Sequence, residues 1–300
     1  MADARRAQQQ RLSEALGGGE FVVSAEAPGG SLAELSSFAA AAVGAGARAV
    51  QVPDGALGRR DDAGMSMLDR IAALATSDAW LVPHVAARHH DPDVICERID
   101  QLARRGAIDG TLVVTGDSAR RDGCADRPDR GPDAASLLQL LAPRVSPAEL
   151  VLGAALGLGE DPALDLDRAA RKVQAGATVL FSQPVFDEAM LESAVEIGAA
   201  LSVPVIVGVL PLRGVEHVDA LERHAPGISV PAAVRAALQQ RAAAAAAAWG
   251  IDHARAMLQL ARSAAAGACI VPGRGGIAVV EAVVGPRPAR RPAADRLPDG

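Results

Sequence analysis

The chain has 300 residues, half of them hydrophobic, a length that suits one large domain or two small ones with a sizeable core. Aromatic residues make up only 2% of the chain and tyrosine is absent, so we expect a core built from Ala, Val, Leu and Ile. The formal net charge of −6 argues against a nucleic-acid partner, because proteins that bind nucleic acid present a basic face.

Cysteine usage and the absence of long apolar stretches predict a soluble, cytoplasmic protein. The three cysteines, Cys96, Cys124 and Cys269, lie far apart and lack the spacing of a metal site, which predicts reduced thiols and no bound metal. Residues 1–19 are charged and rich in Gln, without the apolar segment of a secretory signal. No apolar stretch reaches membrane-spanning length without Gly, Pro or a charge, so we expect no membrane partner.

Apolar runs that end at a polar residue, a glycine or a proline recur along the chain and predict strands. The first run leads to Glu26, and Pro28-Gly29-Gly30 then breaks it. The sixth run ends at Gln183 before a proline, as expected for a buried parallel strand with a polar tip. The predicted strands cover residues 20–25, 47–52, 80–85, 111–115, 150–156, 177–183, 204–210 and 268–271.

Segments typical of helices separate these strands. Ser31 and Glu34 have the spacing of a capping box at the start of the first helix. The alanine run 242–248 is a good helix-forming sequence and is not expected to be a linker. The polar segment 118–130 is a loop long enough to act as a mobile lid. The predicted helices cover residues 31–44, 65–75, 91–105, 132–141, 165–175, 187–200, 215–224, 231–238, 242–248, 251–265 and 277–283.

This alternation predicts an α/β fold, a single-domain (β/α)8 TIM barrel over residues 20–284. Parallel strands joined by right-handed helical crossovers close into a barrel when there are eight of them. A doubly wound open sheet is the main alternative, but no G-x-G-x-x-G follows the first strand. We expect residues 1–19 to form a flexible N-terminal segment and the Pro- and Arg-rich residues 285–300 to form a disordered tail.

In such barrels the chemistry lies where strands end, at the carboxyl face. Glu26 follows an apolar run, which favours its neutral form and suits a proton donor. Asp117 follows a glycine, where a ligand can approach closely, and its carboxylate could accept hydrogen bonds from ring nitrogens. Gln183 offers a donor and an acceptor to a flat heterocycle, and His84 could bond a phosphate or a ribityl group. The polar residues at the predicted strand ends are Glu26, Asp54, His84, Asp117, Gln183 and Arg274.

Each of these residues alone is also compatible with an ordinary structural role, and Lys172, within a predicted helix, would ordinarily be a solvated surface lysine. Their joint placement and their sequence context carry the functional hypothesis. The chain resembles the methylenetetrahydrofolate reductase family, especially the reductase half of bacterial proteins that join it to a homocysteine methyltransferase. The resemblance runs from about Phe21 to Val283. It rests on the segments 24–28, 52–55 with 65–66, 83–85, 114–117, 171–177, 181–187 and 208–212, of which Gly116-Asp117 and Ser182-Gln183-Pro184 with Asp187 are the most specific.

The resemblance implies a flavoprotein of one-carbon and methionine metabolism. Such an enzyme uses NADH or NADPH to reduce FAD, and the hydride then reduces 5,10-methylenetetrahydrofolate to 5-methyltetrahydrofolate. By resemblance, Glu26 is the general acid and Asp117 lies near both flavin and pterin. Gln183 and, less directly, Arg274 bind the folate. The remaining matches, His84, Lys172 and Asp54, are placed with the FAD-binding residues.

Departures from the family pattern leave two alternatives open. The fifth strand ends in Leu156-Gly157-Leu158, where the family has an aromatic residue and polar residues, and Val215 lies where a stacking phenylalanine is expected. This favours a flavin-free relative that binds folate or another pterin and takes hydride directly from NADH. The Ala-rich site also suits a non-catalytic binding protein, and assembly into a homo-oligomer stays open.

Overall fold

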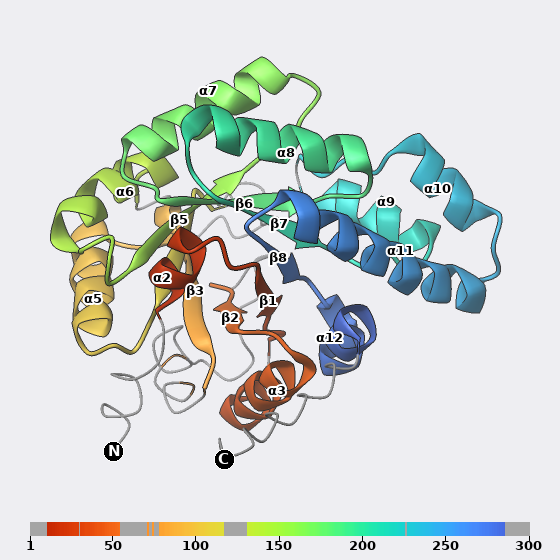
Figure 1. Cartoon of the computed structure of the whole chain (residues 1–300), viewed down its shortest axis with the longest axis horizontal. Helices are drawn as coiled ribbons and strands as arrows, with labels where there is room; N and C mark the ends of the chain where they lie inside the picture. The colour runs from red at the N-terminus through yellow and green to blue at the C-terminus, as the bar shows by residue number, and fades with distance from the viewer. Residues whose placement is uncertain are drawn as a thin grey trace, which may run out of the picture.

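The computed structural model describes residues 11–29, 31–54, 71, 74, 78–116, 131–225 and 227–285. Eight parallel strands form a closed barrel in sequence order, and β1 pairs with β8 to complete it (Figure 1). The predicted TIM barrel is therefore confirmed. Each strand agrees with the predicted range to within two residues at both ends. The strands are β1 (Val22–Glu26), β2 (Ala49–Val52), β3 (Trp80–Ala86), β4 (Gly110–Val114), β5 (Val151–Leu156), β6 (Val179–Pro184), β7 (Val205–Val209) and β8 (Gly267–Ile270).

Helices surround the barrel (Figure 1). Several begin at a residue whose side chain caps the helix. Ser31 accepts a hydrogen bond from the backbone N–H of Glu34, and the Glu34 carboxylate accepts from the Ser31 backbone, which confirms the capping box. The predicted helix 65–75 lies mostly outside the described residues. The helices are α2 (Leu12–Gly17), α3 (Leu32–Ala45), α5 (Pro92–Arg104), α6 (Ala134–Leu141), α7 (Pro162–Gln174), α8 (Glu188–Leu201), α9 (Val215–His224), α10 (Ala232–Gln239), α11 (Ala243–Ala264) and α12 (Gly276–Val284).

The predicted flexible segment 1–19 is described from residue 11 onward, and part of it is helical. Residues 12–17 form helix α2, whose Leu12 and Ala15 are fully buried. The Leu12 side chain lies against Gly110 at the start of β4, and the Ser13 hydroxyl donates to the Ala148 carbonyl. The helix thus covers the amino-terminal end of the barrel, because burying its apolar face outweighs the charged character of the segment.

The region after α10 also differs from the prediction, since one continuous helix replaces the two expected over 242–248 and 251–265. Helix α11 runs through Gly250 without a break. A β-carbon at Gly250 would lie only 1.7 Å from the Leu212 carbonyl oxygen. The glycine is therefore required for close packing against the β7–α9 connection and does not end a helix.

Three apolar clusters hold these layers together. The largest lies between the strands and the surrounding helices. The second fills the barrel interior and includes Leu12 and Cys269, and the third joins α9, α10 and α11 around Phe186. In the part of the chain that the structure describes, no helix is long and apolar enough to cross a membrane.

Candidate functional site

The carboxyl ends of the strands bring several predicted site residues to one mouth of the barrel. Trp80, Val82, Ala49, Val22, Val179 and Phe181 belong to the interior cluster. Because side chains alternate along a strand, residues two or four positions further on point the same way. Glu26 on β1, Gln51 on β2, His84 on β3 and Gln183 on β6 therefore face the interior, in a layer above the apolar cluster.

Glu26 is the last residue of β1 and has the properties of a proton donor. Burial raises the pKa of this carboxyl from 4.5 to about 7. No hydrogen bond or ion pair to its carboxyl occurs among the described residues, so the charged form is not compensated. A carboxyl in this state can give up or take a proton near neutral pH.

Three polar side chains form a buried chain beside Glu26. Gln51, which pairs in register with Glu26, is only 2% exposed. Its Nε2 lies 2.9 Å from Ser24 Oγ, and its Oε1 lies 2.8 Å from His84 Nε2. Burial lowers the pKa of His84 from 6.5 to about 4, although the negative charge of Asp54 opposes this. His84 is therefore a neutral imidazole whose position is fixed by its hydrogen bond to Gln51.

Gln51 is not among the residues predicted from the sequence. The available signal was one polar residue in the otherwise apolar strand Ala49-Val50-Gln51-Val52. Such a residue faces the interior only if the register places it there, and the register comes from the closed barrel.

Asp54, just after β2, is engaged within the protein. Its Oδ2 accepts hydrogen bonds from the Ala86 backbone N–H at 3.1 Å and from His90 Nε2 at 2.5 Å. Burial raises the pKa of Asp54, but the His90 hydrogen bond and charge and the Ala86 amide together lower it below its usual value. Asp54 therefore fixes the position of the last residue of β3 and of His90 after it. Its role in binding a cofactor stays a prediction.

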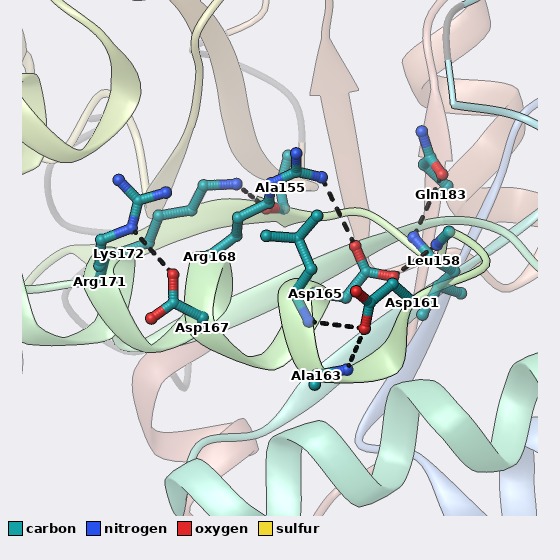
Figure 2. A network of polar contacts seen from close by, with 12 residues as sticks. Ala155, Leu158, Asp161, Ala163, Asp165, Asp167, Arg168, Arg171, Lys172 and Gln183 are labelled. Carbon is teal, nitrogen blue, oxygen red and sulfur yellow. Dashed lines mark hydrogen bonds and ion pairs between the residues drawn. The ribbon is translucent and has the colours of Figure 1, made fainter.

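Lys172 lies in a basic hollow beside the barrel and is not a solvated surface lysine. Its Nζ donates to the Ala155 carbonyl at 2.5 Å, near the end of β5 (Figure 2). Burial and the neighbouring positive charges of Arg168 and Arg171 lower its pKa. The hollow has a volume of about 200 Å³, and its lining residues are Thr115, Asp133, Ala134, Ala135, Arg168, Arg171 and Lys172.

Gln183 is connected to the same helix through the β5–α7 loop (Figure 2). Its Oε1 accepts from the Leu158 backbone N–H at 3.3 Å. The adjacent Gly159 N–H donates to the carboxylate of Asp165, which is 5% exposed, at 2.5 Å. Arg168 of the basic hollow lies 3.9 Å from Asp165. A short chain of contacts therefore joins the hollow to the polar tip of β6.

The remaining predicted residues are less informative. Arg274 is exposed in the 3-10 turn Gly273–Gly275 after β8. A second hollow of about 170 Å³ lies beside that turn, lined mostly by apolar side chains with Arg213 and His217. Asp117 and the loop 118–130 lie outside the described residues. Among the described residues, no group of three or more His, Cys, Asp or Glu side chains could hold a metal ion.

The methylenetetrahydrofolate reductase family model matches residues 33–268, well over half of the chain. The chain belongs to this family. The match covers β2 to β7 and every quoted motif except residues 24–28, which carry Glu26, and it confirms the family resemblance. A comparison with curated proteins found no significant match.

Solved structures share the fold of this methylenetetrahydrofolate reductase family member. One is a Clostridium thermocellum protein that binds two copies of 5-methyl-5,6,7,8-tetrahydrofolic acid; it is 12% identical, with a TM-score of 0.58, over 91% of this chain and 97% of that one. Another is 2,3-dimethylmalate lyase of the PEP mutase/isocitrate lyase superfamily, 14% identical, with a TM-score of 0.53, over 93% and 83% of the two chains. At these identities the likeness shows the barrel fold alone.

The few aromatic side chains of this family member do not line the mouth of the barrel. The chain has four Phe, two Trp and no Tyr. Phe38, Phe181, Phe186 and Trp80 are at most 6% exposed within the apolar clusters. The remaining two lie elsewhere: Arg262 covers the ring of Phe21, and Trp249 stacks on His253 in α11. A ring-shaped ligand at the mouth would therefore be bound mainly by aliphatic and polar groups.

Proposed function

We propose that the chain is a cytoplasmic, FAD-dependent reductase that uses NADH or NADPH to reduce 5,10-methylenetetrahydrofolate to 5-methyltetrahydrofolate. Family membership supports the reaction class. The observation that carries the proposal is Glu26, a carboxyl with a pKa of about 7 at the carboxyl end of β1, in the interior layer that also holds Gln183.

The basic hollow has side chains that fit an anionic cofactor such as FAD. Arg168, Arg171 and Lys172 line a space of about 200 Å³ beside the first turn of α6, and one carboxylate residue, Asp133, lines it with them. Cationic side chains attract phosphate groups, whereas the N–H groups of Ala134 and Ser136 at the start of α6 are already bonded to Thr115 and Asp133. In this proposal the hollow holds the diphosphate of FAD. The chemistry that FAD supplies when bound is the relay of a hydride from NADH or NADPH to the folate.

Glu26 supplies the proton in the proposed reaction. Opening the five-membered ring of 5,10-methylenetetrahydrofolate leaves an iminium carbon that can accept hydride, and protonation of the departing ring nitrogen promotes that opening. Glu26 is half protonated near pH 7, so its carboxyl can donate this proton without a large cost. Gln183 would orient the pterin ring, with its Oε1 held by Leu158.

The visible spectrum of the purified full-length protein tests the proposal most directly. We expect a yellow protein, or one that gains flavin absorbance with added FAD, and that oxidises NADH or NADPH with menadione as acceptor. A colourless protein that neither binds FAD nor oxidises NADH with menadione would overturn the flavoenzyme proposal.

The placement of the aromatic residues favours one alternative, a folate-binding relative without flavin. Aromatic contacts to a bound ring each contribute about 1 kcal/mol, and the mouth of this barrel has none of the chain's Phe or Trp rings. This alternative predicts NADH oxidation that depends on folate in protein shown to be free of flavin. If folate raises the melting temperature but neither nucleotide is oxidised, a non-catalytic binding protein is supported instead.

A further inference from the structure

Gln51 joins the first three strands through the buried polar chain at the mouth of the barrel. Ser24 is 1% and Gln51 2% exposed. Ser24 Oγ lies 3.3 Å from the Ala268 carbonyl oxygen, Gln51 Nε2 lies 2.9 Å from Ser24 Oγ, and His84 Nε2 lies 2.8 Å from Gln51 Oε1. Ser24 Oγ, both polar atoms of the Gln51 amide and His84 Nε2 are therefore paired.

The Ala268 carbonyl sets the direction of these hydrogen bonds, because a carbonyl can only accept. Ser24 uses its one proton for this carbonyl, so its oxygen must accept from the amide nitrogen of Gln51. That orientation presents the Gln51 oxygen to His84, and a carbonyl oxygen needs a donor. His84 must therefore carry its proton on Nε2.

The other ring nitrogen of His84 then has a defined role. His84 is only partly buried, and no described residue is bonded to Nδ1. In a neutral imidazole with a proton on Nε2, Nδ1 is an acceptor. Burial keeps the ring neutral, with a pKa of about 4, and Asp54, the charged group acting on it from the end of β2, raises that value only in part.

We infer that Gln51 is a positioning residue that holds His84 as a hydrogen-bond acceptor at the mouth of the barrel. The ligand group opposite His84 is therefore a donor, a hydroxyl or an N–H, and not a phosphate or carboxylate oxygen. Of the two groups considered for His84 from the sequence, the ribityl hydroxyls fit and the phosphate does not. The identity of that ligand as a flavin rests on the proposed function, whereas the state of His84 does not.

Long-range ¹H–¹⁵N NMR of the imidazoles in the full-length, ligand-free protein tests the inference without activity. The His84 signals are assigned by comparison with His84→Asn. We expect a neutral Nε2–H tautomer from pH 8 to about pH 5. A proton on Nδ1, or a charged ring at pH 7, would overturn the inference.

Substitution of Gln51 tests whether this residue is the cause. In Gln51→Glu, a carboxylate replaces the amide oxygen and should raise the pKa of His84 from about 4 into the range of about 5–7. In Gln51→Met the acceptor is lost, and we expect both neutral tautomers. If His84 keeps the wild-type state in both variants, Gln51 does not position it. Gln174→Glu, a change of the same charge at an exposed position of α7, is the matched control.

FAD titration links this state to binding. Between pH 6 and 8, we expect the FAD affinity of the wild type and of Gln174→Glu to have the same pH dependence. Gln51→Glu should add a pH-dependent change of about threefold to tenfold, as His84 loses its acceptor on protonation. If it adds none, the inferred donor–acceptor contact is wrong. If the wild type binds no FAD at all, the proposed function fails, while the NMR result still decides the state of His84.

Discussion

The mouth of the barrel and the basic hollow beside α7 differ in how far their ionisable side chains are exposed to solvent. At the mouth, Glu26 and His84 are held where burial favours their neutral forms. In the hollow, Arg168 and Arg171 lie exposed to solvent and pair with the carboxylates of Asp165 and Asp167. The difference suits the two tasks of the proposed function: groups at the mouth exchange protons, and exposed cations in the hollow attract an anionic ligand.

The strongest test of this division is the loss of the Glu26 proton. Glu26→Gln keeps the size of the side chain but cannot donate a proton as an acid, so folate reduction should fall by about 100-fold or more. Reduction of FAD by NADH needs no proton from Glu26 and should change little. Stopped-flow measurement of the two half-reactions checks this. An equal fall in both would show that Glu26 supports binding or folding instead.

The same substitution should raise stability at high pH. The pKa of Glu26 is about 7 in the folded protein and about 4.5 in the unfolded chain. The folded state therefore binds the extra proton between these values, and its stability falls as the pH rises through this window, by up to about 3 kcal/mol. Urea unfolding should find Glu26→Gln more stable than the wild type at pH 8, with a smaller difference at pH 4.5. A constant difference at both pH values would contradict the burial argument.

In the hollow, removing charge should change affinity and leave the proton chemistry intact. The double variant Arg171→Gln with Lys172→Met should weaken FAD binding by about tenfold or more, because two cations that line the proposed diphosphate site are lost. The loss should shrink as salt is raised, since exposed charges are screened. Fluorescence titration of FAD at several salt concentrations measures both effects. Arg105→Gln, at an exposed site at the end of α5, is the control and should bind FAD as the wild type does.

The smallest effect is expected where the two regions meet, at the β5–α7 loop. Asp165→Ala removes the acceptor for the Gly159 N–H and should loosen Leu158, which holds Gln183. We expect the KM for folate to rise about threefold to tenfold, with less effect on folate-saturated kcat. Asp167→Ala, on the same helix but solvent-exposed, should leave KM unchanged. If both variants behave alike, the loop does not connect the hollow to Gln183.

The sequence predicted the barrel because its signals are local and repeat. Each strand is an apolar run that ends at a turn residue, and side chains such as Ser31 and Asp91 mark helix starts. The positions of Glu26, His84 and Gln183 at strand ends followed from those boundaries. Asp117 was predicted with equal reasoning, and its role stays a prediction.

What the sequence missed depends on contacts between distant segments. The charged N-terminal stretch gave no sign that Leu12 would be buried beneath the barrel. Gly250 looks like a helix break until the Leu212 carbonyl is seen against it. Lys172 resembles a surface residue of an amphipathic helix, and only the end of β5 supplies the carbonyl that holds its ammonium. In each case the partner lies on another element, beyond the reach of a local pattern.

The closure of the barrel has a consequence for how the protein is made. Leu12 from the first described helix and Cys269 from the last strand share one interior cluster, and β1 hydrogen-bonds to β8. The seam between them cannot form until β8 has left the ribosome. Contacts so distant in sequence form slowly. Until β8 is made, the edge of β1 that pairs with it has unpaired backbone groups, which favour aggregation. We therefore expect coexpression of a chaperone, or slow synthesis at low temperature, to raise the yield of folded protein.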